Sequence, residues 1–412
     1  MMIKRDILEL LSKDLHRKEI IALVGSRQVG KTTLMKMLQQ EVTSQSVFLT
    51  FEKLEDLKLF EEDIEFFINK YVKNTDVLFI DEFQYAQSGG QKLKYIYDTC
   101  SVKIIISGSS EPELAIHSLQ YLVGRVFIYK IYPLTFKEFI NERCPENNFL
   151  LDDFSTQNHL LHIKEYFVEY LRYGSYPEVV KEENEEVKIR ILENLVNSYL
   201  LKEIKDILSY KNVFEYETLL QRFALQDGSL LNKNTFSQEL GIYNNKINEM
   251  TNVLEKTYIL GLARPFLKNK IKEQIKSPKS YIQDLGFKNT LIKNYNPLTL
   301  KNDKGMIYEN FVFNSLLRNG IKAGFWNIQN RHEVDFVYEK DGDIVGIEVK
   351  SKLTNNSLTL SMKKFIEQMK PAYLYVFNEN IDSDTMVENT RVIFTNFINC
   401  VQLTQHREMV NL

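Results

Sequence analysis

The sequence predicts an α/β protein with a parallel β-sheet in its N-terminal part, followed by a helical segment and a smaller, separate α/β unit. Three observations lead to this prediction. Up to about residue 140, short apolar runs rich in β-branched residues alternate with amphipathic helical patterns, as in parallel strands that are buried on both faces. From about 150 to 210 the apolar residues follow helical spacing. From about 303 onward, a helix precedes two alternating strands, a second helix and a further strand.

Length, composition and charge limit the class of protein. The 412 residues suffice for two or three domains, and a composition with 44% apolar and 26% charged residues lets each domain bury a core. Lys and Arg number 52 and Asp and Glu number 55, which gives a formal net charge of −3. This balance excludes a uniformly basic protein that coats nucleic acid, although it permits a local basic surface.

Cysteine usage and apolar run lengths bear on the cellular compartment. The three cysteines lie far apart without CxxC spacing, so we expect neither a disulfide framework nor a thiolate zinc site. The first residues alternate apolar and charged side chains, unlike a signal peptide, and the longest apolar runs are too short to cross a bilayer. We therefore expect a cytoplasmic protein that does not associate with membranes.

A glycine-rich loop with the pattern G-x-x-x-x-G-K-[ST] occupies residues 25–32, after the apolar run IIALV and before a helical pattern. Such a loop points successive backbone N–H groups at phosphate oxygens, and the helix N-terminus adds partial positive charge. We expect Lys31 to reach the β- and γ-phosphates of ATP and Thr32 to ligate Mg²⁺. The alternative, a tight glycine turn without a ligand, is disfavoured by the strand and helix on either side.

The segment VLFIDEF places two acidic residues at the end of a buried strand, beside the loop. Asp81 would hold Mg²⁺ through water, and Glu82 would orient and activate the attacking water; two solvated acids at a strand end are the alternative. The next strand ends at Ser107, whose hydroxyl either senses the γ-phosphate or belongs to an ordinary turn. The predicted nucleotide-binding residues are Gly25, Ser26, Arg27, Gln28, Val29, Gly30, Lys31, Thr32, Thr33, Asp81 and Ser107, and the predicted Mg²⁺ ligands among them are Thr32 and Asp81.

The segments GSRQVGKTT, LFIDEFQ, ISGSS, LVGRVFIYKIYPLTFKEF and YGSYPEVV follow one another as in a family of prokaryotic AAA+-type ATPases, which the chain resembles over nearly its whole length. The resemblance implies a P-loop ATPase core at 1–150 with a helical lid at 151–210, a winged helix at 211–300 and a restriction-endonuclease-like domain at 301–412. It also suggests Arg125, in the GR pair, as a sensor or arginine finger, with an ordinary surface arginine as the alternative. Because AAA+ relatives often form rings, a homo-oligomer is compatible with the resemblance.

Residues 234–283 predict two short helices around a glycine-centred turn and then two strands, the arrangement of a helix-turn-helix with a wing. Between Arg264 and Lys279, six basic residues oppose one acidic residue, for a net charge of +5. These residues are Arg264, Lys268, Lys270, Lys272, Lys276 and Lys279 against Glu273. The cluster indicates either contact with the phosphates of double-stranded DNA or a solvated hairpin tip.

Two acidic residues and a lysine are predicted to meet in the C-terminal unit. Asp335 in EVDFVY and both Glu348 and Lys350 in GIEVKSK lie on strands joined by the turn EKDGD, and a side-chain period of two brings them together. Asp335 and Glu348 could bind Mg²⁺ or Mn²⁺, while Lys350 could position the attacking water. Upstream, Glu309 lies on the apolar side of a helix, where a carboxylate requires a partner.

These four residues resemble the PD-(D/E)xK nuclease constellation, with Val334 in place of the usual proline before the aspartate. An intact metal site and a nuclease-like fold without cleavage both remain open. The catalytic candidates of the whole chain are Lys31, Glu82, Arg125, Glu309, Asp335, Glu348 and Lys350.

Two functional hypotheses follow from these sites. In the first, the protein is an ATP-binding, Mg²⁺-dependent ATPase coupled to DNA binding and to metal-dependent DNA cleavage by the C-terminal domain. In the second, it is a nucleotide-controlled regulatory switch whose C-terminal domain binds a partner without cleaving it. A purely structural role is hard to reconcile with a complete phosphate loop and the Asp81–Glu82 pair.

Overall fold

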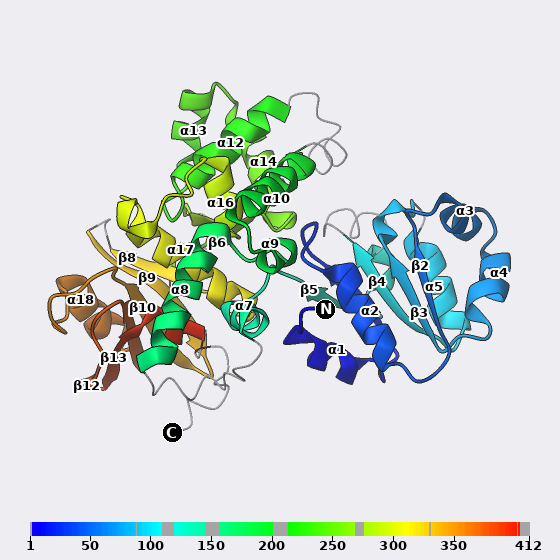
Figure 1. Ribbon diagram of the computed structural model, residues 1–412, viewed down its shortest axis with the longest axis horizontal. Helices are drawn as coiled ribbons and strands as arrows, with labels where there is room; N and C mark the ends of the chain where they lie inside the picture. The colour runs from blue at the N-terminus through cyan, green and yellow to red at the C-terminus, as the bar shows by residue number, and fades with distance from the viewer. Residues whose placement is uncertain are drawn as a thin grey trace.

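The structure is a computed structural model that describes residues 2–87, 89–108, 119–144, 157–200, 213–267, 276–328, 331–401 and 403. Its N-terminal part, blue to cyan in Figure 1, lies apart from a larger body made by the rest of the chain. The strand β5 and the helices that follow it join the two.

The N-terminal part contains a five-stranded sheet in the order β2-β3-β4-β1-β5, and every neighbouring pair is parallel. The predicted α/β class and parallel sheet are therefore confirmed. The strands are β1 (Ile20–Val24), β2 (Ser46–Thr50), β3 (Val77–Asp81), β4 (Lys103–Gly108) and β5 (Val126–Lys130). The helices are α1 (Ile7–Asp14), α2 (Lys31–Glu41), α3 (Leu54–Glu62), α4 (Ile64–Phe67) and α5 (Gly89–Thr99). Helix α7 (Phe136–Arg143) follows β5 and packs into the core of the larger body.

Strand β1 shows why these apolar runs are continuous. Ile21 and Leu23 face a core shared with helices α1 and α2, whereas Ile20, Ala22 and Val24 face a second core shared with α3 and α5. Because successive side chains of a strand point to opposite faces, a strand covered on both faces needs apolar residues at every position.

Next come α8 (Gln157–Tyr173), α9 (Pro177–Lys181) and α10 (Glu185–Ser198), then α12 (Val213–Leu225), α13 (Lys233–Leu240), α14 (Asn244–Lys256) and α16 (Leu285–Leu291). Between α14 and α16, β6 (Leu260–Ala263) and β7 (Lys279–Ile282) pair antiparallel. The two short helices predicted around a glycine-centred turn are α13 and α14, with Gly241 in the left-handed conformation (φ 66°) after α13. The predicted wing residues Lys268, Lys270 and Lys272 lie outside the described residues.

The C-terminal part is a six-stranded mixed sheet in the order β12-β13-β11-β10-β9-β8. Its elements are α17 (Lys304–Arg318), β8 (Gly324–Ile328), β9 (His332–Lys340), β10 (Asp343–Val349), α18 (Leu360–Met369), β11 (Tyr373–Asn378), β12 (Ser383–Val387) and β13 (Thr390–Asn396). The predicted hairpin is β9–β10, with a two-residue turn at Asp341 (φ 53°) and Gly342 (φ 92°). None of the described helices combines the length and the apolar character that crossing a membrane requires.

A buried ion pair holds the glycine-rich loop against the segment after β5. The Glu138 carboxylate accepts from Arg5 Nε at 3.1 Å and from the Asp6 backbone N–H at 2.8 Å, and it caps α7 together with Thr135. The Arg5 guanidinium also donates to Val29 O in the loop and to Tyr132 O after β5, each at 2.9 Å. Arg5 therefore connects three backbone segments, and its charge is balanced by Glu138.

Removal of the Glu138 carboxylate should destabilise the protein. Glu138→Ala leaves the buried Arg5 without a counter-charge, and we expect the free energy of unfolding to fall by about 3 kcal/mol. Urea titration followed by circular dichroism measures the change. Asp98→Ala is the matched control, because Asp98 pairs with the partly exposed Arg125 and should matter by less than about 1 kcal/mol. Equal effects of the two substitutions would contradict the role assigned to Glu138.

Candidate functional site

The loop at residues 25–32 has the backbone that phosphate binding requires. A Cβ on Gly25 would lie 2.1 Å from Ile131 O, so only glycine permits the close approach of the loop to the end of β5. Gly30 adopts φ 97° directly before α2, and Gln28 adopts φ 61°. The loop therefore turns sharply and delivers the N-terminus of α2 to its concave side, which favours an anion there.

Lys31 and Thr32 occupy the first turn of α2, and each side chain donates a hydrogen bond within the site. The Lys31 ammonium donates to the loop carbonyls of Gly25 at 2.8 Å and Ser26 at 2.9 Å, and the side chain is buried. The Thr32 hydroxyl donates to Asp81 Oδ2 at 2.6 Å. The two predicted Mg²⁺ ligands therefore touch each other, although they lie on different elements.

The acidic pair at the end of β3 is fixed by Ser107 from β4. The Ser107 hydroxyl donates to Asp81 Oδ1 and accepts the Glu82 backbone N–H at 3.2 Å. Ser107 is fully buried, so it orients the two acids and does not line the pocket above the loop. Glu82 adopts φ 54°, which turns its side chain away from the strand direction, and its carboxylate accepts from Gln84.

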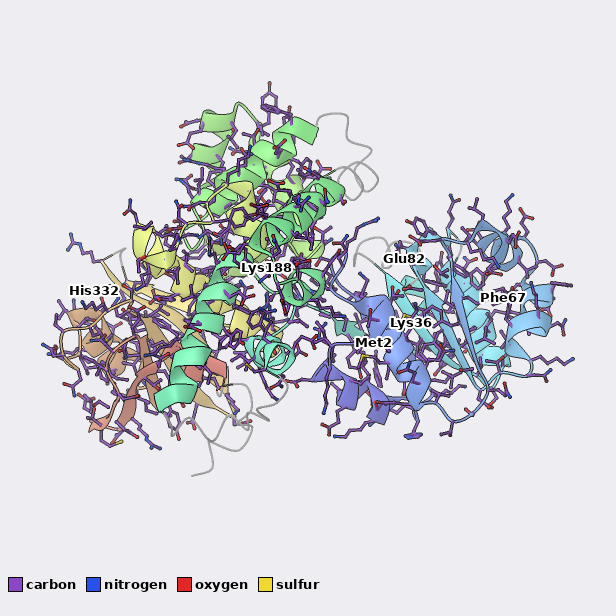
Figure 2. All side chains as sticks on the ribbon, in the orientation of Figure 1. Met2, Lys36, Phe67, Glu82, Lys188 and His332 are labelled. Atoms are coloured by element: carbon purple, nitrogen blue, oxygen red, sulfur yellow. The ribbon has the colours of Figure 1, made fainter. Side chains whose placement is uncertain are left out.

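A pocket of about 520 Å³ lies over the loop, and residues of α9 and the end of α10 line its other side. Its lining residues are Arg27, Gln28, Gly30, Lys31, Thr32, Thr33, Glu82, Pro177, Glu178, Lys181 and Ser198. In Figure 2, Glu82 lies on the side of the N-terminal part that faces the body carrying Lys188 on α10. Six of the predicted loop residues and Glu82 therefore line one pocket together with α9 and the end of α10, whereas Gly25, Ser26 and Val29 do not line it.

Sequence reasoning missed the four residues from α9 and α10 because they are remote from the loop in the chain. The signal that could have found them is the segment YGSYPEVV, where proline at the first turn of a short helix follows a glycine. Gly174 adopts φ 72°, and a Cβ there would lie 2.1 Å from Asp284 Oδ1. This close approach places α9 against the loop.

Arg125 lies far from this pocket. The Ile20 N–H donates to Arg125 O at 2.8 Å, so Arg125 precedes β5 at the N-terminal edge of the sheet, whereas the loop follows β1 at the opposite edge. The length of β1, roughly 16 Å at ~3.3 Å per residue, separates the two edges. The Arg125 side chain pairs with Asp98 at 3.0 Å. Contact between Arg125 and a nucleotide on its own loop is incompatible with this geometry, and a role in trans stays a prediction.

The C-terminal part brings together the four residues predicted there, which are Glu309, Asp335, Glu348 and Lys350. Asp335 on β9 accepts the Val349 N–H of β10 at 2.8 Å. Lys350 pairs with Glu348 at 2.6 Å, and Glu348 is only 3% exposed. Glu309 on α17 influences the pKa of Asp335 through its charge, as expected for neighbouring carboxylates. We name Glu309, Asp335, Glu348 and Lys350 the carboxylate centre.

An additional lysine from β7 enters this centre. The Lys279 ammonium lies 2.9 Å from Glu309 Oε1, 2.6 Å from Glu333 Oε1 and 3.9 Å from Asp335 Oδ1. The prediction that Lys279 faces DNA as part of an exposed basic hairpin is wrong, because the residue is only 5% exposed. The sequence signal was ambiguous, since Lys279 stands at the end of a basic stretch and differs from its neighbours only in its tertiary position.

Burial dominates the electrostatics of the carboxylate centre. It raises the pKa of Asp335, and the charge of Glu309 raises it further. Burial likewise raises the pKa of Glu348, followed by the charge of Asp335, although Lys350 opposes this rise. The two carboxylates therefore disfavour being ionised together unless more positive charge is present.

The side chains present fit one divalent cation. Glu348 Oε2 is buried without a hydrogen-bond partner, and such an orphaned carboxylate oxygen is the kind of ligand that Mg²⁺ and Mn²⁺ take. Within the described part of the chain, no group of three or more His, Cys, Asp or Glu residues is arranged to hold a metal. The protein would therefore supply Asp335 and Glu348, and water or substrate would complete the coordination.

The nucleotide pocket and the C-terminal part meet at Asp284. Its carboxylate accepts the N–H of Ser175 at 2.9 Å and the hydroxyl of Ser175 at 3.0 Å, and it caps α16. Arg318, at the end of α17, lies 3.8 Å from Asp284 and donates to Leu134 O at 2.6 Å and to Ser175 Oγ at 3.0 Å. Ser175, which lies just before Tyr176 and α9, is therefore bound to Arg318 at the end of α17, the helix that carries Glu309.

Comparisons with known proteins agree with the ATPase-like geometry. Residues 17–140 match the family described as AAA domain, whereas 164–298 and 304–397 match two domains of unknown function, DUF8612 and DUF4143. Among curated proteins, an uncharacterized protein of Haemophilus influenzae is 26% identical over 82% of this chain and 84% of its own length. Another, from Methanocaldococcus jannaschii, is 24% identical over 88% of this chain and 83% of its own.

Solved structures give more distant similarities. A Walker-type ATPase of Pyrococcus abyssi superposes with a TM-score of 0.44 and 15% identity, covering 71% of this chain and 96% of its own. The RuvB Holliday junction branch migration motor of Thermotoga maritima superposes with a TM-score of 0.33 and 15% identity, covering 66% and 95%. The family match, the parallel sheet and the complete phosphate loop lead to one conclusion. The chain has an AAA-like P-loop ATPase core in its N-terminal part.

Proposed function

We propose that this protein is a Mg²⁺-dependent ATPase whose nucleotide state acts on its C-terminal carboxylate centre. The observation that carries the proposal is the hydrogen bond from Thr32 to Asp81, because Thr32 lines a pocket together with Lys31 and Glu82. These groups are what phosphoryl transfer to water needs: a cation for the phosphates, oxygen ligands for Mg²⁺ and a carboxylate that orients water.

Each residue has a distinct role in this proposal. Thr32 and Asp81 would hold Mg²⁺, which neutralises charge on the β- and γ-phosphates when it is bound. Lys31 exchanges its present loop carbonyl partners for phosphate oxygens, which are stronger acceptors for an ammonium. Glu82 accepts a proton from the attacking water, and Gln84, which already donates to Glu82, holds the carboxylate in place.

Helix α9 supports a coupling role for the nucleotide. Pro177, Glu178 and Lys181 line the pocket, and the Tyr176 hydroxyl lies 3.4 Å from Ser26 Oγ in the loop. A bound γ-phosphate would attract Lys181 and repel Glu178, so occupancy of the pocket changes the force on α9. Because Ser175 precedes this helix and is tied to Asp284, that force reaches α16 and α17.

Replacement of the loop lysine tests the ATPase proposal. Lys31→Ala removes the ammonium that stabilises charge on the phosphates, and we expect kcat for ATP hydrolysis to fall by at least about 100-fold. Phosphate release under steady-state conditions measures the rate. Lys36→Ala is the matched control, because Lys36 lies on the same helix, is exposed and should leave the rate unchanged. Normal ATP binding and hydrolysis by Lys31→Ala protein would rule the proposal out.

For the carboxylate centre, we propose divalent-cation-dependent cleavage of DNA. Asp335 and Glu348 would hold one Mg²⁺ or Mn²⁺, which acts as a Lewis acid when it is bound. Lys350 contacts Glu348 yet is 38% exposed, so its ammonium can turn toward a phosphate oxygen and stabilise developing negative charge. Burial raises the pKa of both carboxylates, and a bound divalent cation would favour their ionised forms.

One observation favours the alternative of a switch that binds without cleaving. Lys350 pairs with Glu348, and Lys279 pairs with Glu309 and lies near Asp335, so lysines already balance part of the acidic charge. A centre neutralised in this way is stable without a metal, as a docking element would be.

DNA incubation separates the two functions. Purified protein and its Lys350→Ala variant are incubated with plasmid and linear DNA, with and without ATP, in Mg²⁺ and in Mn²⁺. We expect metal-dependent cleavage that the variant loses, because the Lys350 ammonium is the side-chain group proposed to contact the scissile phosphate directly. Lys352→Ala is the control, since this exposed lysine lies two residues further along the chain. Retention of DNA that changes with ATP, without cleavage, would favour the switch.

Charge balance in the centre gives a further prediction. Lys279→Met leaves three acidic residues without their shared ammonium, and we expect the free energy of unfolding in EDTA to fall by about 3 kcal/mol. Fluorescence of Trp326, the only tryptophan and a buried residue of β8, reports this unfolding. Mn²⁺ should restore part of the loss in the variant, because a divalent cation can replace the missing charge.

The matched control for this substitution is Lys304→Met on α17. Lys304 pairs with Glu379 at 2.7 Å, but both side chains are about one third exposed, so the change in stability should stay below about 1 kcal/mol. A Lys279→Met protein as stable as the parent, with or without Mn²⁺, would show that Lys279 does not balance the centre.

A further inference from the structure

A second cavity lies where three parts of the chain meet, and it is distinct from the nucleotide pocket. We name it the junction cleft; it measures about 690 Å³, within the range of small-molecule and cofactor sites. Its walls come from the end of β5, from the segment α14–β6 and from the segment between α17 and β8. The residues that the argument uses are Lys130, Tyr132, Tyr258, Arg264, Phe313 and Lys322.

The charge on the rim of the junction cleft is positive. Lys130, Arg264 and Lys322 are exposed, and each comes from a different wall. Among the lining residues, Glu255 is the one carboxylate. A fourth cation, Arg318, is already committed to Asp284 and to neighbouring carbonyls, so it contributes to the walls and not to the charge of the rim.

The interior of the junction cleft is aromatic. Tyr258 is packed edge-on against Tyr132 at 6.0 Å between ring centroids, and the Lys130 ammonium lies 5.5 Å from the Tyr258 ring. Phe313 adds a further ring from α17. Exposed cations around aromatic rings form the combination that binds phosphates and bases of a nucleic-acid strand together.

The junction cleft also adjoins both centres described above. Phe313 stacks on Tyr281 at 4.2 Å, and the Tyr281 hydroxyl donates to Glu309 at 2.7 Å, so one pair of stacked rings connects the cleft with the carboxylate centre. On the other side, Tyr132 O accepts from Arg5, which also holds Val29 of the phosphate loop. A ligand in the cleft would therefore contact elements that support each centre.

We propose that the junction cleft binds nucleotide units of a nucleic-acid strand, with phosphates on Lys130, Arg264 and Lys322 and a base against the partly exposed ring of Tyr132. A strand carries a phosphate on every nucleotide, so it meets cations from three walls at once, which a free mononucleotide cannot do. The inference rests on the proposed action on DNA and deepens it, because it names a single-strand site that combines Arg264 of the predicted wing with Lys130 and Lys322 from other parts of the chain.

The test measures binding of a fluorescein-labelled strand of 20 deoxythymidines to the full chain by fluorescence anisotropy, in EDTA and without ATP. We expect Arg264→Gln/Lys322→Gln protein to bind about tenfold more weakly at moderate salt. The slope of log Kd against log salt should also fall by about 1.4, since each lost phosphate contact removes about 0.7 on single strands. Lys58→Gln/Lys363→Gln protein, with the same loss of charge on the exposed faces of α3 and α18, is the control.

Two further arms examine the chemistry of the ligand. Tyr132→Phe should retain affinity and Tyr132→Leu should lose it, because stacking needs a ring and not a hydroxyl. Unlabelled deoxythymidine strand should displace the probe far more effectively than thymidine monophosphate at equal nucleotide concentration.

Three results would overturn the proposal. These are unchanged affinity of the Arg264→Gln/Lys322→Gln protein, an unchanged salt slope of that protein, or equal displacement by the monophosphate. Since neither metal nor ATP is present, binding can succeed where cleavage and hydrolysis fail, and the two sets of proposals can be told apart.

Discussion

The close approach of Gly174 to the segment around Gly286 is the constraint on which the arrangement of this protein depends. A Cβ on Gly286 would lie 2.0 Å from Tyr173 O, and one on Gly174 would lie 2.1 Å from Asp284 Oδ1. Two glycines are therefore required before the Asp284 carboxylate can reach both Ser175 and the first turn of α16. The close approach of these two segments places α9 over the phosphate loop. The Asp284 carboxylate also places Arg318, at the end of α17, beside α9.

Buried charges connect the parts of the molecule more than they stabilise them. Arg5 with Glu138, Lys288 with Asp227, and Lys279 with Glu309 are all pairs whose members belong to different elements. A buried ion pair contributes little net stability, because desolvation offsets most of its attraction, but loss of one partner is strongly unfavourable. Such pairs therefore act as orientation constraints: an alternative packing that separates the partners leaves a buried charge uncompensated.

Sequence reasoning succeeded where the physical signal is local. The central strands β1, β3 and β4 could be predicted because strands covered on both faces need continuous apolar runs, as in Ile20–Val24. Asp335, Glu348 and Lys350 could be predicted to meet because a short turn and a period of two determine which side chains of a hairpin are neighbours. Thr32 and Asp81 follow from the loop pattern and from a strand that ends beside it.

The signals that failed are those that depend on tertiary position. Lys279 belongs to a basic stretch, yet three carboxylates from α17 and β9 surround it, and nothing local distinguishes it from Lys276. Lys181 lines the nucleotide pocket only because Gly174 and Asp284 bring α9 there. Arg125 is the instructive case, because a residue just before β5 lies at the sheet edge opposite the loop, and this much was derivable from the strand directions.

The path from the nucleotide pocket to the carboxylate centre is short because few elements separate them. Tyr176 lies near the loop, Ser175 next to it is bound by Asp284, and β7, which ends two residues before Asp284, carries Lys279 into the centre. Any displacement of α9 must therefore either break the contacts of a buried carboxylate or carry the end of β7 with it. Breaking them leaves Asp284 buried beside an unsatisfied Ser175 N–H, so concerted movement is the less costly response. In the proposed coupling, nucleotide state would therefore act through β7, and Lys279, which contacts Glu309 of the carboxylate centre, would respond first.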